Sequence, residues 1–158
     1  LLRRGIDTED KLKHFCYDTP ADLSDPFLMK GMQAAVDRII LALQKKEPLV
    51  IYGDYDVDGI TATSILYRFL KREGADVRFY IPARETEGYG LNLPAVQKLA
   101  EEGGKLLITV DNGIAAADII AQAPETMDII VTDHHLVPEK IPNAIAATIN
   151  KKSEAKRS

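Results

Sequence analysis

The stretch Leu49–Gly59, LVIYGDYDVDG, joins an apolar run to an acidic turn. Residues 49–52 are apolar or aromatic without interruption, which is typical of a strand buried on both faces of a parallel sheet. Directly after them, Asp54, Asp56 and Asp58 occupy alternate positions before a glycine. Three carboxylates this close together repel one another unless a positive partner neutralises them. The stretch therefore predicts a buried strand that ends in a site for a cationic ligand.

Strands and helices alternate outward from this stretch. Apolar runs predict further strands at 77–81, 106–110, 127–132 and 144–149, and helical spacing predicts helices at about 62–73, 93–102 and 114–122. Asp25 as N-cap and Pro26 at the first helical position predict one more helix, ending near Lys46, and a short helix is expected near Glu9–Phe15. The pattern is that of an α/β protein. We expect a parallel β-sheet of about five strands with helices on both faces, preceded by an N-terminal helix.

The composition restricts the class of protein. The 158 residues suffice for one domain, and no apolar run approaches the roughly 20 residues of a membrane-spanning helix. The first 15 residues lack the apolar core of a signal peptide. Cys16 is the single cysteine, which excludes an internal disulfide and fits a reducing cytoplasm. The net charge of −4 argues against a protein that coats nucleic acid, but it leaves room for a nuclease whose metal ions meet the phosphates.

Polar residues follow the predicted strands at the point where each strand ends. Asp111 follows the strand at 106–110, and Asp133-His134-His135 follow the strand at 127–132. The carboxyl ends of parallel strands share one edge of the sheet, so these residues are expected to meet the three aspartates of GDYDVDG in one crevice. Oxygen ligands mixed with imidazole suit Mn²⁺ or Mg²⁺, and also accept Zn²⁺ or Co²⁺. Such a set is large enough for two ions, which favours hydrolysis of a phosphodiester.

Simpler interpretations of the same residues exist. DxDxDG also opens an EF-hand loop, but the twelfth position counted from Asp54 is Ile65 instead of glutamate. A solvated acidic turn without a ligand is the stronger alternative for GDYDVDG taken alone. Asp111-Asn112-Gly113 alone is typical of a turn, and His134-His135 alone fits a helix cap or a surface pair.

Five stretches together resemble the DHH phosphoesterase superfamily, named after the triplet at Asp133. Within it, the chain is similar to the RecJ family of bacterial single-stranded-DNA exonucleases. In chain order the stretches are DPFLMKGMQAAVDRI, VIYGDYDVDGITATSILYRFL, IPARETEGYGL, LLITVDNGI and IIVTDHHLVPEKIPNA, which cover about residues 20–150. The resemblance implies Mn²⁺- or Mg²⁺-dependent removal of nucleotides from the 5′ end of single-stranded DNA in recombination and repair.

The resemblance also implies roles for individual residues. Asp111 would bridge two ions, His135 would face the scissile phosphate, and Asp133 would hold the imidazoles in orientation. The implied metal ligands are Asp54, Asp56, Asp58, Asp111 and His134, with Asp54 either a direct ligand or one layer further out. Tyr52 stands where many superfamily members have a histidine, so one metal position is expected to differ.

The segment after the second strand is the expected substrate-binding loop. There, Arg84 is expected to pair with a phosphate and Tyr89 to stack on a base, beside the phosphate at His135. A surface salt bridge for Arg84 and a packed loop aromatic for Tyr89 are alternatives of equal weight.

The sequence suggests three parts: an N-terminal extension and helix (1–46), a DHH domain (47–150) and a disordered basic tail (151–158). The resemblance implies that the domain is incomplete at its C-terminus, because the family continues with another metal-binding aspartate and a glycine-rich substrate motif. Activity without that continuation stays open, and so do protein partners in replication or repair.

Two competing functions remain open. The first is another DHH phosphoesterase, which acts on short RNA, cyclic dinucleotides or pyrophosphate. The second is a non-catalytic DHH-like module that binds nucleic acid or a protein partner. The intact aspartates and histidines argue against the second function.

Overall fold

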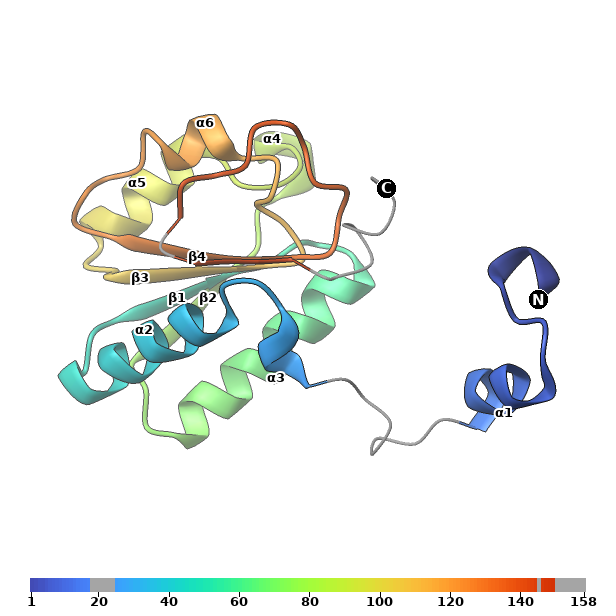
Figure 1. Ribbon diagram of the computed structural model, residues 1–158. Helices are drawn as coiled ribbons and strands as arrows, with labels where there is room; N and C mark the ends of the chain where they lie inside the picture. Colours follow the sequence, from blue (N-terminus) through green and yellow to red (C-terminus); the bar gives the residue numbers. More distant parts are fainter. Residues whose placement is uncertain (18–24, 145, 150–158) are drawn as a thin grey trace.

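The computed structural model describes residues 1–17, 25–144 and 146–149, and its centre is a parallel β-sheet (Figure 1). The five strands run in the order β2-β1-β3-β4-β5. Their bounds are β1 Leu49–Tyr52, β2 Val77–Tyr80, β3 Leu106–Val110, β4 Asp128–Asp133 and β5 Ala146–Ile149. Leu49 of β1 is in register with Val77 of β2 and Leu106 of β3. The predicted α/β class with about five parallel strands is confirmed.

Helices cover both faces of this sheet (Figure 1). On one face lie α2 (Met32–Lys45) and α3 (Val57–Arg72); on the other lie α4 (Arg84–Glu87), α5 (Leu93–Glu101) and α6 (Ala117–Ile120). Each face of the sheet packs a hydrophobic core against its helices. Strand β1 contributes side chains to both cores, because its side chains alternate between the two faces. Leu49 and Ile51 pack with α2 and α3, whereas Val50 and Tyr52 pack with α5 and α6. All four β1 residues are buried, as the uninterrupted apolar run predicted.

The order of the strands reverses at β1, which determines where the crevice lies. From β1 the chain passes through α3 to β2 on one side, and it then returns to β3 on the other side of β1. The loops after β1 and β3 therefore leave the sheet towards opposite faces. In parallel α/β sheets, ligands bind at such a reversal, beyond the carboxyl ends of the strands.

The N-terminal part differs in detail from the prediction. Helix α1 (Glu9–Tyr17) is present and buries none of its residues. The helix expected from Pro26 begins only at Met32. Asp25 does cap a turn, since its Oδ1 accepts a hydrogen bond from Phe27 N at 2.9 Å, but Pro26–Leu28 is a 3₁₀ turn. Gly31, with φ 78°, then redirects the chain into α2.

Two other helices depart from the sequence pattern. The helix expected at 114–122 shortens to the four residues of α6, and α4 was not expected at all. The tail at 151–158 lies outside the described residues, so its predicted disorder stays a prediction. Within the described ranges, no helix is both long and apolar enough to cross a membrane.

Candidate active site

The turn between β1 and α3 holds two aspartates by backbone hydrogen bonds. Asp54 is buried, and its Oδ1 accepts from Tyr55 N at 2.7 Å. Asp56 is the N-cap of α3, where its Oδ1 accepts from Gly59 N at 2.9 Å. This N–H group is the main reason why the pKa of Asp56 lies below its usual value. A Cβ on Gly59 would lie 2.6 Å from Asp54 Cβ, so only glycine lets the first turn of α3 pack this closely.

Asp111 directly follows β3 and has an unusual backbone conformation. Its φ is 63°, in the left-handed region that few non-glycine residues adopt. The side chain is buried. Oδ2 has no hydrogen-bond partner among the residues that the structure describes, and Oδ1 faces the imidazole of His134, whose Nε2 lies 2.7 Å away. Burial, together with the negative charge of Asp56, raises the pKa of Asp111. Backbone strain combined with a buried carboxylate that has one oxygen without a donor is typical of a functional site.

The end of β4 supplies two imidazoles that make different contacts. Asp133 is buried, and its Oδ2 accepts from Ile114 N at 2.9 Å. Its Oδ1 accepts from His135 N at 3.0 Å and lies 2.7 Å from His135 Nδ1. The Nδ1–H therefore donates to Asp133, and this hydrogen bond raises the pKa of His135. His134 instead places Nε2 2.7 Å from Asp111 Oδ1.

Asp133 was expected to hold the imidazoles in orientation. In the described part of the chain Asp133 contacts His135, whereas His134 lies against Asp111, and the orienting role stays a prediction. The N–H of Ile114 was missed altogether. A backbone donor leaves no trace in the residue type, so the sequence held no signal for it.

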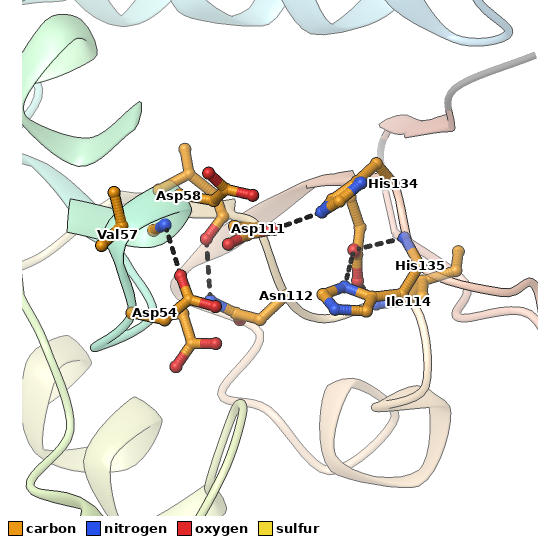
Figure 2. A network of polar contacts seen from close by, with 12 residues as sticks. Asp54, Val57, Asp58, Asp111, Asn112, Ile114, His134 and His135 are labelled. Carbon is orange, nitrogen blue, oxygen red and sulfur yellow. Dashed lines mark hydrogen bonds and ion pairs between the residues drawn. The ribbon is translucent and has the colours of Figure 1, made fainter. Parts of the chain in front are cut away.

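The three strand ends converge on Asp111 (Figure 2). Asp111 forms one potential metal-ligand group with Asp54 and Asp56, and a second with His134 and His135. Within each group the ligand atoms lie within 4.8 Å of one another. The convergence expected from the ends of parallel strands is therefore present, and Asp111 is the member that both groups share.

Asp58 belongs to neither of these two groups. Its side chain is exposed in the first turn of α3. It lines a hollow of about 340 Å³ together with Asp111 and His134. Asp58 thus lies at the rim of the site, and its role as a metal ligand stays a prediction.

The loop after β2 brings Tyr89 to the site. Tyr89 is largely exposed, and its hydroxyl lies 3.3 Å from His135 Nε2. The backbone of Arg84 opens α4, but its side chain lies outside the part of the chain that the structure describes. The phosphate contact expected of Arg84 therefore stays a prediction.

Tyr52 holds the loop after β2 in place through hydrogen bonds of its hydroxyl group. Its hydroxyl donates to Gly90 O at 3.1 Å and accepts from Asn92 Nδ2 at 3.0 Å. Asn92 in turn caps α5 by accepting from Ala95 N at 2.8 Å. Tyr52, which stands where many superfamily members have a histidine, thus packs on the α5 face of the sheet. It belongs to neither potential ligand group.

Comparison with known proteins assigns the chain to a class. A family model described as "DHH family, N-terminal domain" matches residues 48–158. The chain belongs to the DHH family.

Within that family, the chain is similar to single-stranded-DNA-specific exonucleases. The chain is 46% identical over 147 residues to the single-stranded-DNA-specific exonuclease RecJ of Bacillus subtilis (strain 168), an alignment that covers 92% of this chain and 19% of the relative. Among solved structures, exonuclease RecJ bound to manganese superposes with a TM-score of 0.73 at 34% identity, covering 80% of this chain and 33% of that one. RecJ in complex with Mn²⁺ from Thermus thermophilus gives a TM-score of 0.65 at 31% identity, covering 77% and 17%. The chain spans about a fifth of the length of the curated relatives it matches.

Proposed function

We propose that this chain carries the metal-binding part of a RecJ-type exonuclease that hydrolyses phosphodiester bonds of single-stranded DNA from the 5′ end. One observation carries the proposal. Asp111 is buried and strained, has one carboxylate oxygen without a donor among the described residues, and is shared by both potential ligand groups. A carboxylate with two oxygens at this position is suited to bridge two cations.

The donor set fits Mn²⁺ or Mg²⁺. Three carboxylates form one group, and a carboxylate with two imidazoles forms the other. Hard oxygen ligands with some imidazole suit Mn²⁺, and an all-carboxylate group suits Mg²⁺ as well. The solved RecJ structures to which the chain is similar are described as complexes with Mn²⁺ or Mg²⁺. We assign Asp54, Asp56, Asp111 and His134 as ligands, with Asp58 at the rim. Bound divalent ions supply an activated water and neutralise charge on the phosphate oxygens.

The side chains around these ligands have their own tasks. Asp133 fixes the orientation of the His135 ring through Nδ1, so that Nε2 is directed away from Asp133 and towards the site. We assign His135 to contact the scissile phosphate. Tyr89, beside His135, is positioned to stack on a base, and Arg84 is assigned to a substrate phosphate.

The choice of substrate rests on the relatives. The curated relatives are described as single-stranded-DNA-specific exonucleases. We extend their single-stranded substrate to this chain. The 5′-to-3′ polarity, the role in recombination and repair in the cytoplasm, and protein partners from those processes are part of the same proposal and rest on the family resemblance alone.

The test is Mn²⁺-dependent release of mononucleotides from a 5′-labelled single strand by this chain. Asp111→Asn is the site variant, because asparagine keeps the shape and tolerates the left-handed backbone. Asp37→Ala removes a carboxylate from the exposed side of α2 and is the matched control. We expect cleavage by the wild type and the control, with a loss of at least about 100-fold in Asp111→Asn.

Other results would contradict parts of the proposal. Cleavage of a dinucleotide but not of a long strand would assign the chain to a different branch of DHH phosphoesterases. A folded chain that binds Mn²⁺ but cleaves neither substrate would be a binding module, and catalysis by this chain would be refuted.

A further inference from the structure

The backbone on both sides of Asp111 is held by hydrogen bonds. Asn112 Nδ2 donates to Val110 O at 3.0 Å, so the residue after Asp111 is tied to the residue before it. Thr109 Oγ1 donates to Asn112 O at 2.7 Å, and this bond also spans Asp111. On the neighbouring strand β4, Thr132 O accepts from Asp111 N at 3.0 Å. Strained backbone persists only where its surroundings impose it, and these bonds enclose the φ of 63° at Asp111.

Asn112 also connects the loop of Asp111 to the loop that carries the other carboxylates. Its Nδ2 donates a second hydrogen bond, at 3.3 Å, to Tyr52 O, the last carbonyl group of β1. The turn that holds Asp54 begins directly after Tyr52. Asp54 and Asp111 are members of the same potential ligand group. Asn112 therefore ties β1 to β3 at the point where the two ligand-bearing loops begin.

Packing alone does not explain an amide at position 112. The side chain is only 2% exposed, and no donor among the described residues reaches Oδ1. A buried acceptor without a donor costs stability, and an apolar side chain of similar size would avoid that cost. Because both hydrogens of Nδ2 point at carbonyl groups, the opposite assignment of the amide would place oxygen against oxygen. The gain from asparagine therefore lies in its two N–H donors.

We propose that Asn112 is a positioning residue for the metal centre. It holds Asp111 in the left-handed conformation and fixes the spacing between Asp111 and Asp54. Both amide hydrogens are used on backbone carbonyl groups, so Asn112 acts through the backbone of the two loops and through Asp111. The inference deepens the proposed function and rests on it, because it requires a divalent cation at Asp111. Residues that orient metal ligands in this way typically change metal affinity by about 10–100-fold when they are replaced.

Two substitutions at position 112 separate the hydrogen bonds from the packing. Asn112→Leu keeps a side chain of similar size and removes both donors, whereas Asn112→Ala removes the size and the donors together. Leu106→Val is the matched control, because it shortens a fully buried side chain at the opposite end of the same strand, β3. Circular dichroism and thermal unfolding check that each variant folds.

The experiment uses Mn²⁺ as the probe, in calorimetry and in electron paramagnetic resonance. We expect both Asn112 variants to bind Mn²⁺ at least about 10-fold more weakly than the wild type, and Leu106→Val to stay within about twofold of it. At saturating Mn²⁺, the spectrum of the wild type should show coupling between neighbouring ions, and both Asn112 variants should lose that coupling. A residue that only supported the fold would lower the stability, as Leu106→Val does, and leave the spectrum unchanged.

Crystal structures of the metal-free variants test the same inference without a cation. In Asn112→Leu and Asn112→Ala, we expect the φ of Asp111 to leave the left-handed region, because the bond that joins its two neighbours is gone. In Leu106→Val, the φ of Asp111 should stay where it is in the wild type.

Several results would overturn the inference. They are a Mn²⁺ affinity of both Asn112 variants within about twofold of the wild type, the same loss of affinity in Leu106→Val, or an unchanged φ of Asp111 in both Asn112 variants. Failure of the proposed function gives a different result. Mn²⁺ binding that is absent from the wild type, or equal in Asp111→Asn, would refute the metal centre. Mn²⁺ binding that Asp111→Asn abolishes and the Asn112 variants leave unchanged would refute the positioning role alone.

Discussion

At the scale of single residues, Asp111 combines features that oppose folding. A non-glycine residue in the left-handed region costs about 1–3 kcal/mol, and a buried carboxylate oxygen without a donor costs a similar amount. Both features are present at Asp111, and its pKa is raised accordingly. A cation between the two ligand groups would remove the charge penalty, so this residue is suited to the metal-bound state.

This conflict predicts a trade-off between stability and metal binding. Asp111→Asn removes the buried charge and keeps a side chain that tolerates the left-handed backbone. Without metal, we expect the variant to be more stable than the wild type by about 1–2 kcal/mol in urea unfolding, because the desolvated charge is gone. Asp37→Ala, on the exposed side of α2, should change stability by less than about 0.5 kcal/mol. An Asp111→Asn variant less stable than the wild type without metal would show that the carboxylate is satisfied in the free protein.

At the scale of elements, the segment between β2 and α5 is held by a partly buried hydrogen-bond pair. The Tyr80 hydroxyl donates to Glu87, which also accepts from Ala83 N at 2.8 Å. The hydrogen bond to Glu87 raises the pKa of Tyr80 to about 12, and it also lowers the pKa of Glu87. The pair closes α4 onto the end of β2, and the same segment carries Tyr89 to His135.

The two pKa shifts limit the stabilisation by the Tyr80–Glu87 hydrogen bond to a defined pH range. Tyr80 has a folded pKa above its unfolded value near 10, so its contribution is complete below pH 10 and is lost as the pH rises towards 12. Glu87 has a folded pKa below its unfolded value near 4.5, so its contribution is present above that pH and is lost under more acidic conditions. We therefore expect Tyr80→Phe to destabilise the chain between about pH 5 and 10 and to converge with the wild type outside that range.

Urea unfolding at a series of pH values measures this range. Tyr67→Phe, whose ring packs against Phe79 of β2, serves as the control and should run parallel to the wild type at all pH values. A constant difference between Tyr80→Phe and the wild type across the whole series would contradict the coupling of Tyr80 to Glu87.

The elements also show what a sequence can predict. Strands β1, β3 and β4 were predictable to within about one residue, because burial on both faces leaves an uninterrupted apolar run. The start of α2 was not predictable, because Asp25-Pro26 begins a 3₁₀ turn as readily as an α-helix and the break depends on the φ of Gly31. The four-residue α4 has too few residues to show any periodicity, and its end depends on the contact between Glu87 and Tyr80.

At the scale of the whole molecule, the candidate site follows from the order of the strands. The sequence predicted which residues stand at strand ends, and parallel pairing made them share an edge. The pairing of the histidines, one to Asp111 and the other to Asp133, depends on side-chain directions that strand spacing does not encode. The orientation of the Asn112 amide likewise depends on two carbonyl groups from different strands. The sequence therefore predicts the crevice, but it does not predict which side chains pair within it.

The same architecture predicts that metal binding stabilises the whole sheet and not only one loop. The ligand groups draw on the ends of β1, β3 and β4, the three central strands, so a bound ion links loops that otherwise separate on unfolding. At a Mn²⁺ concentration of about 100 times Kd, linkage adds about 2.7 kcal/mol to the free energy of unfolding. For a chain of this size, that corresponds to a rise in Tm of roughly 5–10 °C. Asp37→Ala should show the full rise and Asp111→Asn almost none. An equal rise in Asp111→Asn would place the bound metal elsewhere and separate Asp111 from the metal centre.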